Sequence, residues 1–290
     1  MNDYVIITDS SCDLPEKMAR ELELTVLPLA FNLSGKQYYN YLDGRDLSFA
    51  EFYSKIRSGE SCTTSAVNIE AFSSAMRPIL ESGRDVLCLA FSSGLSNTYN
   101  AAKLACEEMA ALYPERKVFA VDTLCASLGE GLLVYLAAQE KRKGKSIEEV
   151  RDWAEETKLH LCHWFTVDDL NHLKRGGRIS GATALIGTML NIKPVLHVDN
   201  EGHLINMGKV RGRRASLSAL VDHMEETATD PASQTVFISH GDAQEDAEFV
   251  AEEVRRRFGV KNILINYVGP VIGAHSGPGT IALFYLGTNR

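Results

Sequence analysis

The first half of the chain alternates between two patterns of apolar residues. Short continuous apolar runs predict buried strands at residues 4–7, 25–33, 85–91 and 117–121. Apolar residues at helical spacing predict helices at residues 16–22, 47–58, 69–80, 101–112 and 124–141. Strands of this kind, separated by helices, are typical of a parallel sheet that helices cover on both faces.

The second half contains the same elements in a different order. Ser146 and Glu149 form a capping-box pattern at the start of a helix that is predicted to end near residue 160. A strand is predicted at residues 161–167, and a hairpin-like turn lies within residues 196–204. The remaining predicted elements are helices at 215–226 and 244–258, strands at 235–239 and 263–268, and a glycine-rich tail.

Two hydroxyl-rich segments stand where helices are predicted to begin. They are Cys62-Thr63-Thr64-Ser65 and the stretch from Ser92 to Thr98, which follows the apolar run 85–91. Hydroxyls and free backbone N–H groups at a helix start can hold an anion without a nearby lysine or arginine. A single hydroxyl is more simply a helix cap, but together the segments hold more hydroxyls than capping needs. They predict a site of neutral donors for a small anionic or polar ligand.

Strand ends indicate where such a site would lie. Thr8-Asp9-Ser10, the serine segment and Asp122-Thr123 all follow predicted strands. In parallel sheets, ligands collect at the carboxyl ends of the strands, so we expect these three segments to share one rim.

The tail at residues 269–280 and two basic stretches are the other candidate sites. The tail holds four glycines and two Gly-Pro steps, which allow its backbone to approach a ligand closely. His275 at its centre is a candidate donor to an oxyanion, or else a structural histidine in a turn. The basic stretches at residues 170–180 and 209–214 could dock a phosphate or an acidic partner, or simply end helices.

Composition narrows the class of protein. The chain of 290 residues is 45% apolar and 23% charged, as expected of a globular protein, and its length suits two domains or one large α/β domain. A net charge of −8 disfavours binding to nucleic acid and to anionic lipid surfaces. The N-terminus does not resemble a signal peptide, no apolar run is long enough for a membrane span, and six scattered cysteines lack any C-x-x-C pair. We therefore expect a cytoplasmic protein with free thiols.

Motifs of a self-contained enzyme are hard to find. The chain has no Walker lysine loop, no G-x-G-x-x-G fingerprint and no cluster with convincing metal spacing. Ser239-His240-Gly241-Asp242 follows a predicted strand but lacks the pattern of a nucleophile elbow. Catalytic residues and a metal site are therefore not predicted.

An ordered set of segments extends over nearly the whole chain: Thr8 to Pro15, Asp43-Gly44, Thr64-Ser65, Ser92 to Tyr99, Asp122-Thr123, Leu170 to Ile179, Lys193-Pro194 and Gly269 to Gly279. In this set, the sequence resembles the DegV family of bacterial fatty-acid-binding proteins. Two positions depart from the family pattern. Ala66-Val67 stands where the family usually has Gln-Pro, and Asn97 stands where it commonly has Gly.

The resemblance implies an α/β fold of two domains. An N-terminal α/β/α domain with a parallel sheet would cover residues 1–160. A smaller C-terminal domain, residues 161–290, would hold a smaller mixed sheet with helices on one side. A long-chain fatty acid would lie between or within the two domains.

The resemblance also implies a binding role without catalytic residues or a cofactor. The fatty-acid carboxylate would be held by Thr64 and Ser96, with Ser93 and His275 nearby. Support would come from Ser65, Asn97, Thr98 and Gly277. The protein would present this carboxylate to a separate fatty acid kinase, which makes acyl phosphate for phospholipid synthesis. Arg175, Arg178 and Arg211 in the basic stretches are then candidates for docking that kinase.

Two other functions remain open from the sequence. A subunit similar to dihydroxyacetone kinase would hold a small carbonyl compound on a histidine, with His275 or His240 as its candidate. A lipid sensor would bind the fatty acid without supporting acyl-phosphate formation.

Overall fold

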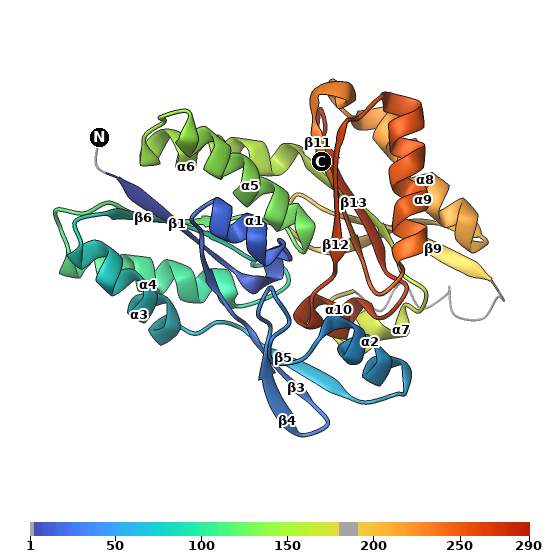
Figure 1. Ribbon diagram of the computed structural model, residues 1–290, viewed down its shortest axis with the longest axis horizontal. Coiled ribbons are helices and arrows are strands. Elements are labelled where there is room, and N and C mark those ends of the chain that lie inside the picture. The colour runs from blue at the N-terminus through green and yellow to red at the C-terminus, as the bar shows by residue number, and fades with distance from the viewer. Residues whose placement is uncertain (1–2, 180–190) are drawn as a thin grey trace.

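A four-stranded parallel sheet forms the first part of the molecule. The computed structural model describes residues 3–179 and 191–290 (Figure 1). The sheet has the strand order β2-β1-β6-β7, and all its neighbours are parallel. Its strands are β1 (Tyr4–Asp9), β2 (Thr25–Leu27), β6 (Asp85–Ala90) and β7 (Val118–Asp122). The predicted parallel sheet is confirmed.

A mixed sheet of six strands forms the second part, in the order β10-β9-β8-β13-β11-β12. Only β11 and β12 are parallel neighbours, and the other pairs are antiparallel. The strands are β8 (Leu161–Thr166), β9 (Ile192–Val198), β10 (Leu204–Arg211), β11 (Thr235–His240), β12 (Asn262–Tyr267) and β13 (Ile281–Leu286). The mixed character is confirmed, but with six strands this sheet is the larger of the two, and the expectation of a smaller sheet was wrong.

The glycine-rich tail at residues 269–280 contains a short helix that was not predicted, α10 (Pro270–Ser276). The apolar run that follows the tail forms β13 between β8 and β11. Hydrogen bonds on both sides place β13 inside the sheet, where a continuous apolar run is stable. The continuous apolar run Ile281–Leu286 is the sequence feature that could have predicted this strand.

A third sheet was not predicted. It is antiparallel, with the order β4-β3-β5, and comprises β3 (Ala30–Leu33), β4 (Lys36–Tyr39) and β5 (Cys62–Ser65). The single strand predicted at 25–33 is divided at Pro28, which cannot donate to a strand ladder. The segment Cys62–Ser65 is a strand rather than the start of a helix, because it pairs with β3.

Helices cover both faces of the parallel sheet, as Figure 1 shows. Side chains alternate along each strand, so Ile7 packs with α3 and α4 while Ile6 packs with α5 and α6. The helices are α1 (Glu16–Glu21), α2 (Phe49–Arg57), α3 (Ile69–Glu81), α4 (Thr98–Leu112), α5 (Leu128–Arg142), α6 (Ile147–Thr157), α7 (Asn171–Arg175), α8 (Arg213–Thr227), α9 (Gln244–Phe258) and α10. Short 3₁₀ turns lie at Ser10–Cys12, Lys158–His160 and Pro231–Ser233.

The mixed sheet is also covered on both faces, and this corrects the expected one-sided arrangement. Val236 and Ile238 pack with α8 and α9 on one face. Phe237 and Phe284 belong to the cluster that contains Leu132 of α5 on the other face. Helix α5 therefore joins the two larger sheets through one hydrophobic core. Because α5 comes before residue 160 and packs against strands that come after it, the division into domains at 160 stays a prediction.

None of the helices within residues 3–179 and 191–290 is both long enough and apolar enough to cross a membrane.

Candidate functional site

A mostly apolar cavity lies where the three sheets meet. We call it the inner cavity; its volume is about 240 Å³. Its apolar lining comes from elements far apart in the sequence, and includes Leu29, Phe91, Phe165, Val198, Val271 and Phe284. An apolar cavity of only about 150 Å³ in another protein takes up benzene. The inner cavity is thus large enough to enclose a hydrocarbon segment.

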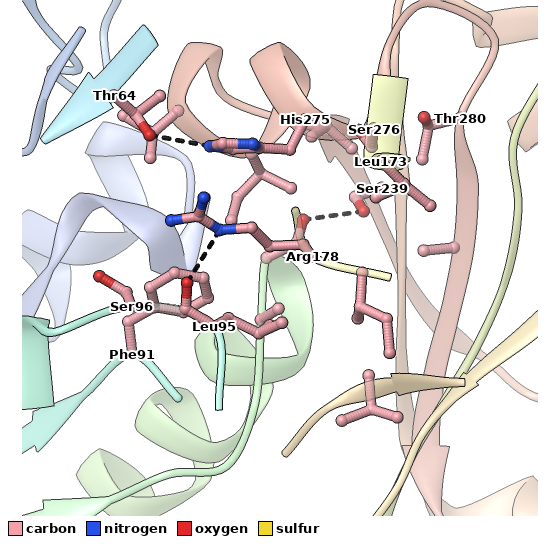
Figure 2. A pocket seen from close by; sticks show the side chains of 18 of the residues that line it. Thr64, Phe91, Leu95, Ser96, Leu173, Arg178, Ser239, His275, Ser276 and Thr280 are labelled. Carbon is pink, nitrogen blue, oxygen red and sulfur yellow. Dashed lines mark hydrogen bonds between the residues drawn. The ribbon is translucent and has the colours of Figure 1, made fainter. Parts of the chain in front are cut away.

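A second concavity, the outer groove, adjoins the inner cavity. Its volume is about 600 Å³, and its lining includes Cys62, Thr63, His172 and Arg175. Among the residues that the structure describes, three line both spaces: Thr64, Arg178 and His275. Figure 2 shows these three side chains converging from separate elements. A ligand in the inner cavity would therefore present its polar end at this junction.

Thr64 and His275 form the first pair of the junction. Thr64 lies on β5 and His275 on α10, and Thr64 Oγ1 is 2.8 Å from His275 Nε2. Burial, together with the nearby positive charge of Arg178, lowers the pKa of His275 to about 4. The imidazole is therefore neutral near pH 7. When its Nε2–H donates to Thr64, the threonine hydroxyl is left to donate to a ligand.

Two glycines, Gly176 and Gly277, leave room for the imidazole rings of His275 and His172. A Cβ added at Gly176 would lie 2.2 Å from His275 Nδ1, and one added at Gly277 would lie 2.5 Å from His172 Cδ2. Gly277 also has a φ of +80°, which disfavours other residues. Gly277 does not line the inner cavity, so its contribution is to let the loop close around the site.

Ser96 contributes a hydroxyl from the segment before α4. Its Oγ lies 2.9 Å from Thr98 Oγ1 and accepts a bond from the Thr98 backbone N–H at 3.2 Å. Ser96 and Asn97 line the inner cavity, as do Ser65 and Ala66. Thr98 is fully buried behind Ser96 and holds it in place. The threonine segment thus reaches the cavity with Ala66 in its lining, despite the departure from the family pattern there.

Ser93 and Arg211 lie outside both the inner cavity and the outer groove. Ser93 is exposed, and its backbone N–H donates to Asp122 at 3.1 Å. It is not among the residues that line the inner cavity. Arg211 is exposed on β10 and lines neither space, whereas Arg175 lines the outer groove.

Arg178 changes the expected chemistry of the site. The hydroxyl segments were expected to work without a nearby cation, and that expectation was wrong. Arg178 Nε donates to the Leu95 carbonyl at 3.1 Å, and its Nη1 donates to the Gly176 carbonyl. These bonds fix the guanidinium between the serine segment and the loop after α7 (Figure 2). Among the described residues, the lining of the inner cavity therefore combines hydroxyls, a neutral imidazole and the cation of Arg178.

A group of buried carboxyl groups, Asp9, Asp13 and Glu130, adjoins residues of the cavity lining, and no local sequence pattern predicted it. Burial raises the pKa of Asp9 to about 6 and that of Asp13 to about 8, and it raises the pKa of Glu130 well above its usual value. Asp9 accepts bonds from the backbone N–H groups of Ser11 and Phe91, which ties β1 to the serine segment. Within the described residues, no group of three or more potential ligands could hold a metal ion.

The raised pKa of Asp13 predicts how stability depends on pH. Between about pH 4 and pH 8 the unfolded chain releases this proton while the folded protein keeps it. The free energy of unfolding then falls as the pH rises, by about 1.4 kcal/mol per pH unit for one group. In Asp13→Asn this contribution is absent, and asparagine tolerates the backbone φ of +51° at this position.

Urea unfolding between pH 6 and pH 8 tests this prediction. The slope of Asp13→Asn should be shallower than that of the wild type by about 1.4 kcal/mol per pH unit. Asp152→Asn, at an exposed position on α6, should run parallel to the wild type. Parallel curves for all three proteins would show that Asp13 is ionised in the folded state.

Comparisons with known proteins agree with this architecture. Residues 3–288 match a family model described as "Uncharacterised protein, DegV family". A DegV domain-containing protein of Clostridium perfringens is 47% identical, covering 100% of this chain and 99% of its own. A DegV family protein of Thermus thermophilus, whose structure is described as showing fatty acid binding, is 33% identical with a TM-score of 0.87, covering 99% and 100%. A DegV lipid binding protein of Thermotoga maritima is 29% identical with a TM-score of 0.87, covering 99% of each chain.

Proposed function

The chain belongs to the DegV family, and from that premise we propose that it binds a long-chain fatty acid and presents the carboxylate to a partner kinase. The observation that carries this proposal is the junction. Thr64, Arg178 and His275 line both an apolar cavity and an open groove. A fatty acid has one apolar and one anionic end, and it matches the two sides of this junction.

The apolar part of the ligand supplies most of the binding energy. Each buried CH₂ group contributes about 0.8 kcal/mol, so a long chain binds tightly even when the head group adds little. The carboxylate then determines which end of the fatty acid binds at the junction. Arg178 and Thr64 supply a cation and a hydroxyl donor at the junction, and Ser96 adds a second hydroxyl within the inner cavity.

A small carbonyl compound fits the site less well. The inner cavity offers an extended apolar lining that a triose would not fill. His240, the other histidine considered for this role, accepts a bond from the Ala243 N–H at 3.2 Å and packs on Tyr267. It does not line the cavity.

Purification of the protein from bacterial cells tests fatty-acid binding directly. Native mass spectrometry should show a retained long-chain acid that organic extraction removes. A protein that carries no acid and does not take up an added one would contradict the proposal.

The outer groove is where a kinase would reach the carboxylate. Arg175 lies in this groove outside the inner cavity, and Arg175→Glu reverses a charge there. We expect acyl-phosphate formation with ATP and a fatty acid kinase to slow by about tenfold, since a rim charge mainly affects association. The affinity for the fatty acid should change little.

Arg77→Glu, at an exposed position on α3, is the matched control and should leave the rate unchanged. Equal rates for both variants would remove Arg175 from the docking surface. If the protein binds fatty acid but no kinase forms acyl phosphate from it, the lipid-sensor function would replace the presenting one.

A further inference from the structure

A second group of polar side chains lines the inner cavity but not the outer groove. It comprises Ser127 at the start of α5, Ser239 on β11 and Ser276 at the end of α10, and we call it the serine cluster. Figure 2 shows Ser239 and Ser276 on the opposite side of the view from Thr64 and Ser96. A hydrocarbon chain needs no polar partner, so the serine cluster calls for an explanation.

Two of these serines belong to a chain of hydroxyls. Ser127 Oγ donates to Asp13 Oδ2 at 2.6 Å and lies 3.0 Å from Ser239 Oγ. Ser239 is fully buried, and it lines the inner cavity. A hydroxyl can donate one bond and accept two, so Ser239 keeps bonding capacity beyond its bond with Ser127.

Ser276 gives the clearest sign of a ligand group. It is 5% exposed and lines the inner cavity. Its Oγ has no hydrogen-bond partner among the residues that the structure describes. A buried hydroxyl without a partner is costly, and such groups occur where a ligand or ordered solvent completes the bonding.

The other polar groups of the lining in this region are already paired. Thr280 Oγ1 donates to the Gly277 carbonyl at 2.8 Å. His163 has Nδ1 3.0 Å from the Leu161 carbonyl, and its Nε2 accepts from the Ala126 N–H at 3.4 Å. The remaining bonding capacity is therefore concentrated on Ser239 and Ser276.

We propose that the serine cluster binds a hydroxyl group carried on the acyl chain, so that the preferred ligands are hydroxy fatty acids. This inference rests on the proposed fatty-acid binding and specifies its substrate class. A neutral hydroxyl can both donate to and accept from serine. A second carboxylate or an ammonium group would lose its hydration to neutral hydroxyls alone.

Displacement of a fluorescent fatty acid tests the inference. The competitors are stearic acid and hydroxystearic acids with the hydroxyl at successive chain positions. At least one positional isomer should bind about tenfold more tightly than stearic acid, since each net hydrogen bond is worth roughly two- to tenfold. The preference should depend on position, because the serine cluster is fixed relative to the carboxylate site.

In Ser276→Ala and Ser239→Ala, the ratio of the affinity for the preferred hydroxystearic acid to that for stearic acid should fall close to one. Ser276→Ala breaks no protein hydrogen bond among the described residues, so its melting temperature should match that of the wild type. Ser93→Ala, at an exposed serine outside the lining, should keep the wild-type ratio.

The outcomes separate the two proposals. If neither stearic acid nor any isomer displaces the probe, fatty-acid binding itself is wrong. If stearic acid binds and no isomer binds more tightly, or if the preference survives in both alanine variants, the serine cluster does not recognise a hydroxyl.

Discussion

Thr64→Val is expected to weaken fatty-acid binding by roughly 10- to 100-fold. Valine keeps the shape of threonine but has no hydroxyl. The substitution removes one donor to the carboxylate and also the partner of His275 Nε2, which lies 2.8 Å away. Leaving buried polar groups unpaired costs about 1–3 kcal/mol, and 1.4 kcal/mol corresponds to tenfold in affinity. Displacement of a fluorescent fatty acid measures the effect.

Thr63→Val is the matched control. Thr63 precedes Thr64 on β5, so its side chain points to the other face of the strand. It lines the outer groove but not the inner cavity. Its affinity should therefore stay within about twofold of the wild type. Equal affinities for both variants would show that the carboxylate does not bind at the junction.

The alternation of strands and helices made the fold largely predictable. Helices such as α9 (Gln244–Phe258) follow directly from periodicity and caps. The three-stranded sheet was missed because its pairing joins β3 to β5, about thirty residues away, and no local pattern in Cys62–Ser65 specifies that partner. Pairing with β3 makes Cys62–Ser65 a strand, although its sequence alone resembles a loop.

The site was predicted only in part, again because tertiary contacts cannot be read from a local sequence pattern. Hydroxyl-rich segments are visible in a sequence, and Thr64, Ser96 and His275 all line the inner cavity. Arg178 was predicted only as a candidate for docking the kinase, because nothing in residues 170–178 shows that the loop folds back onto Leu95. The serine cluster was missed for the same reason, since its members come from three distant elements.

Arg178 also bears on how the carboxylate would react. A guanidinium that already donates to two backbone carbonyls has less freedom to form a bidentate pair with a ligand. It can fix the orientation of the carboxylate while one oxygen still faces the outer groove. The restrained guanidinium of Arg178 is thus compatible with presentation, which a tight ion pair would oppose by lowering the nucleophilicity of that oxygen.

Gly129→Ala is expected to destabilise the protein by about 3 kcal/mol, although alanine in place of a helical glycine usually stabilises. Gly129 lies in the first turn of α5, and an added Cβ would be 2.1 Å from His163 Nε2. The imidazole cannot easily move. It is fully buried, it is held at Nδ1 by the Leu161 carbonyl, and it packs edge-on against Phe284 at 5.2 Å.

Urea unfolding measures this loss, and Gly208→Ala provides its control. An added Cβ at Gly208 on β10 meets nothing within 4 Å, so its free energy of unfolding should stay within about 0.5 kcal/mol of the wild type. Because α5 joins the two larger sheets, the effect of Gly129→Ala should appear as one cooperative transition at lower urea. A separate early transition would mean that the two sheets unfold independently, and unchanged stability would show that His163 does not fix the start of α5.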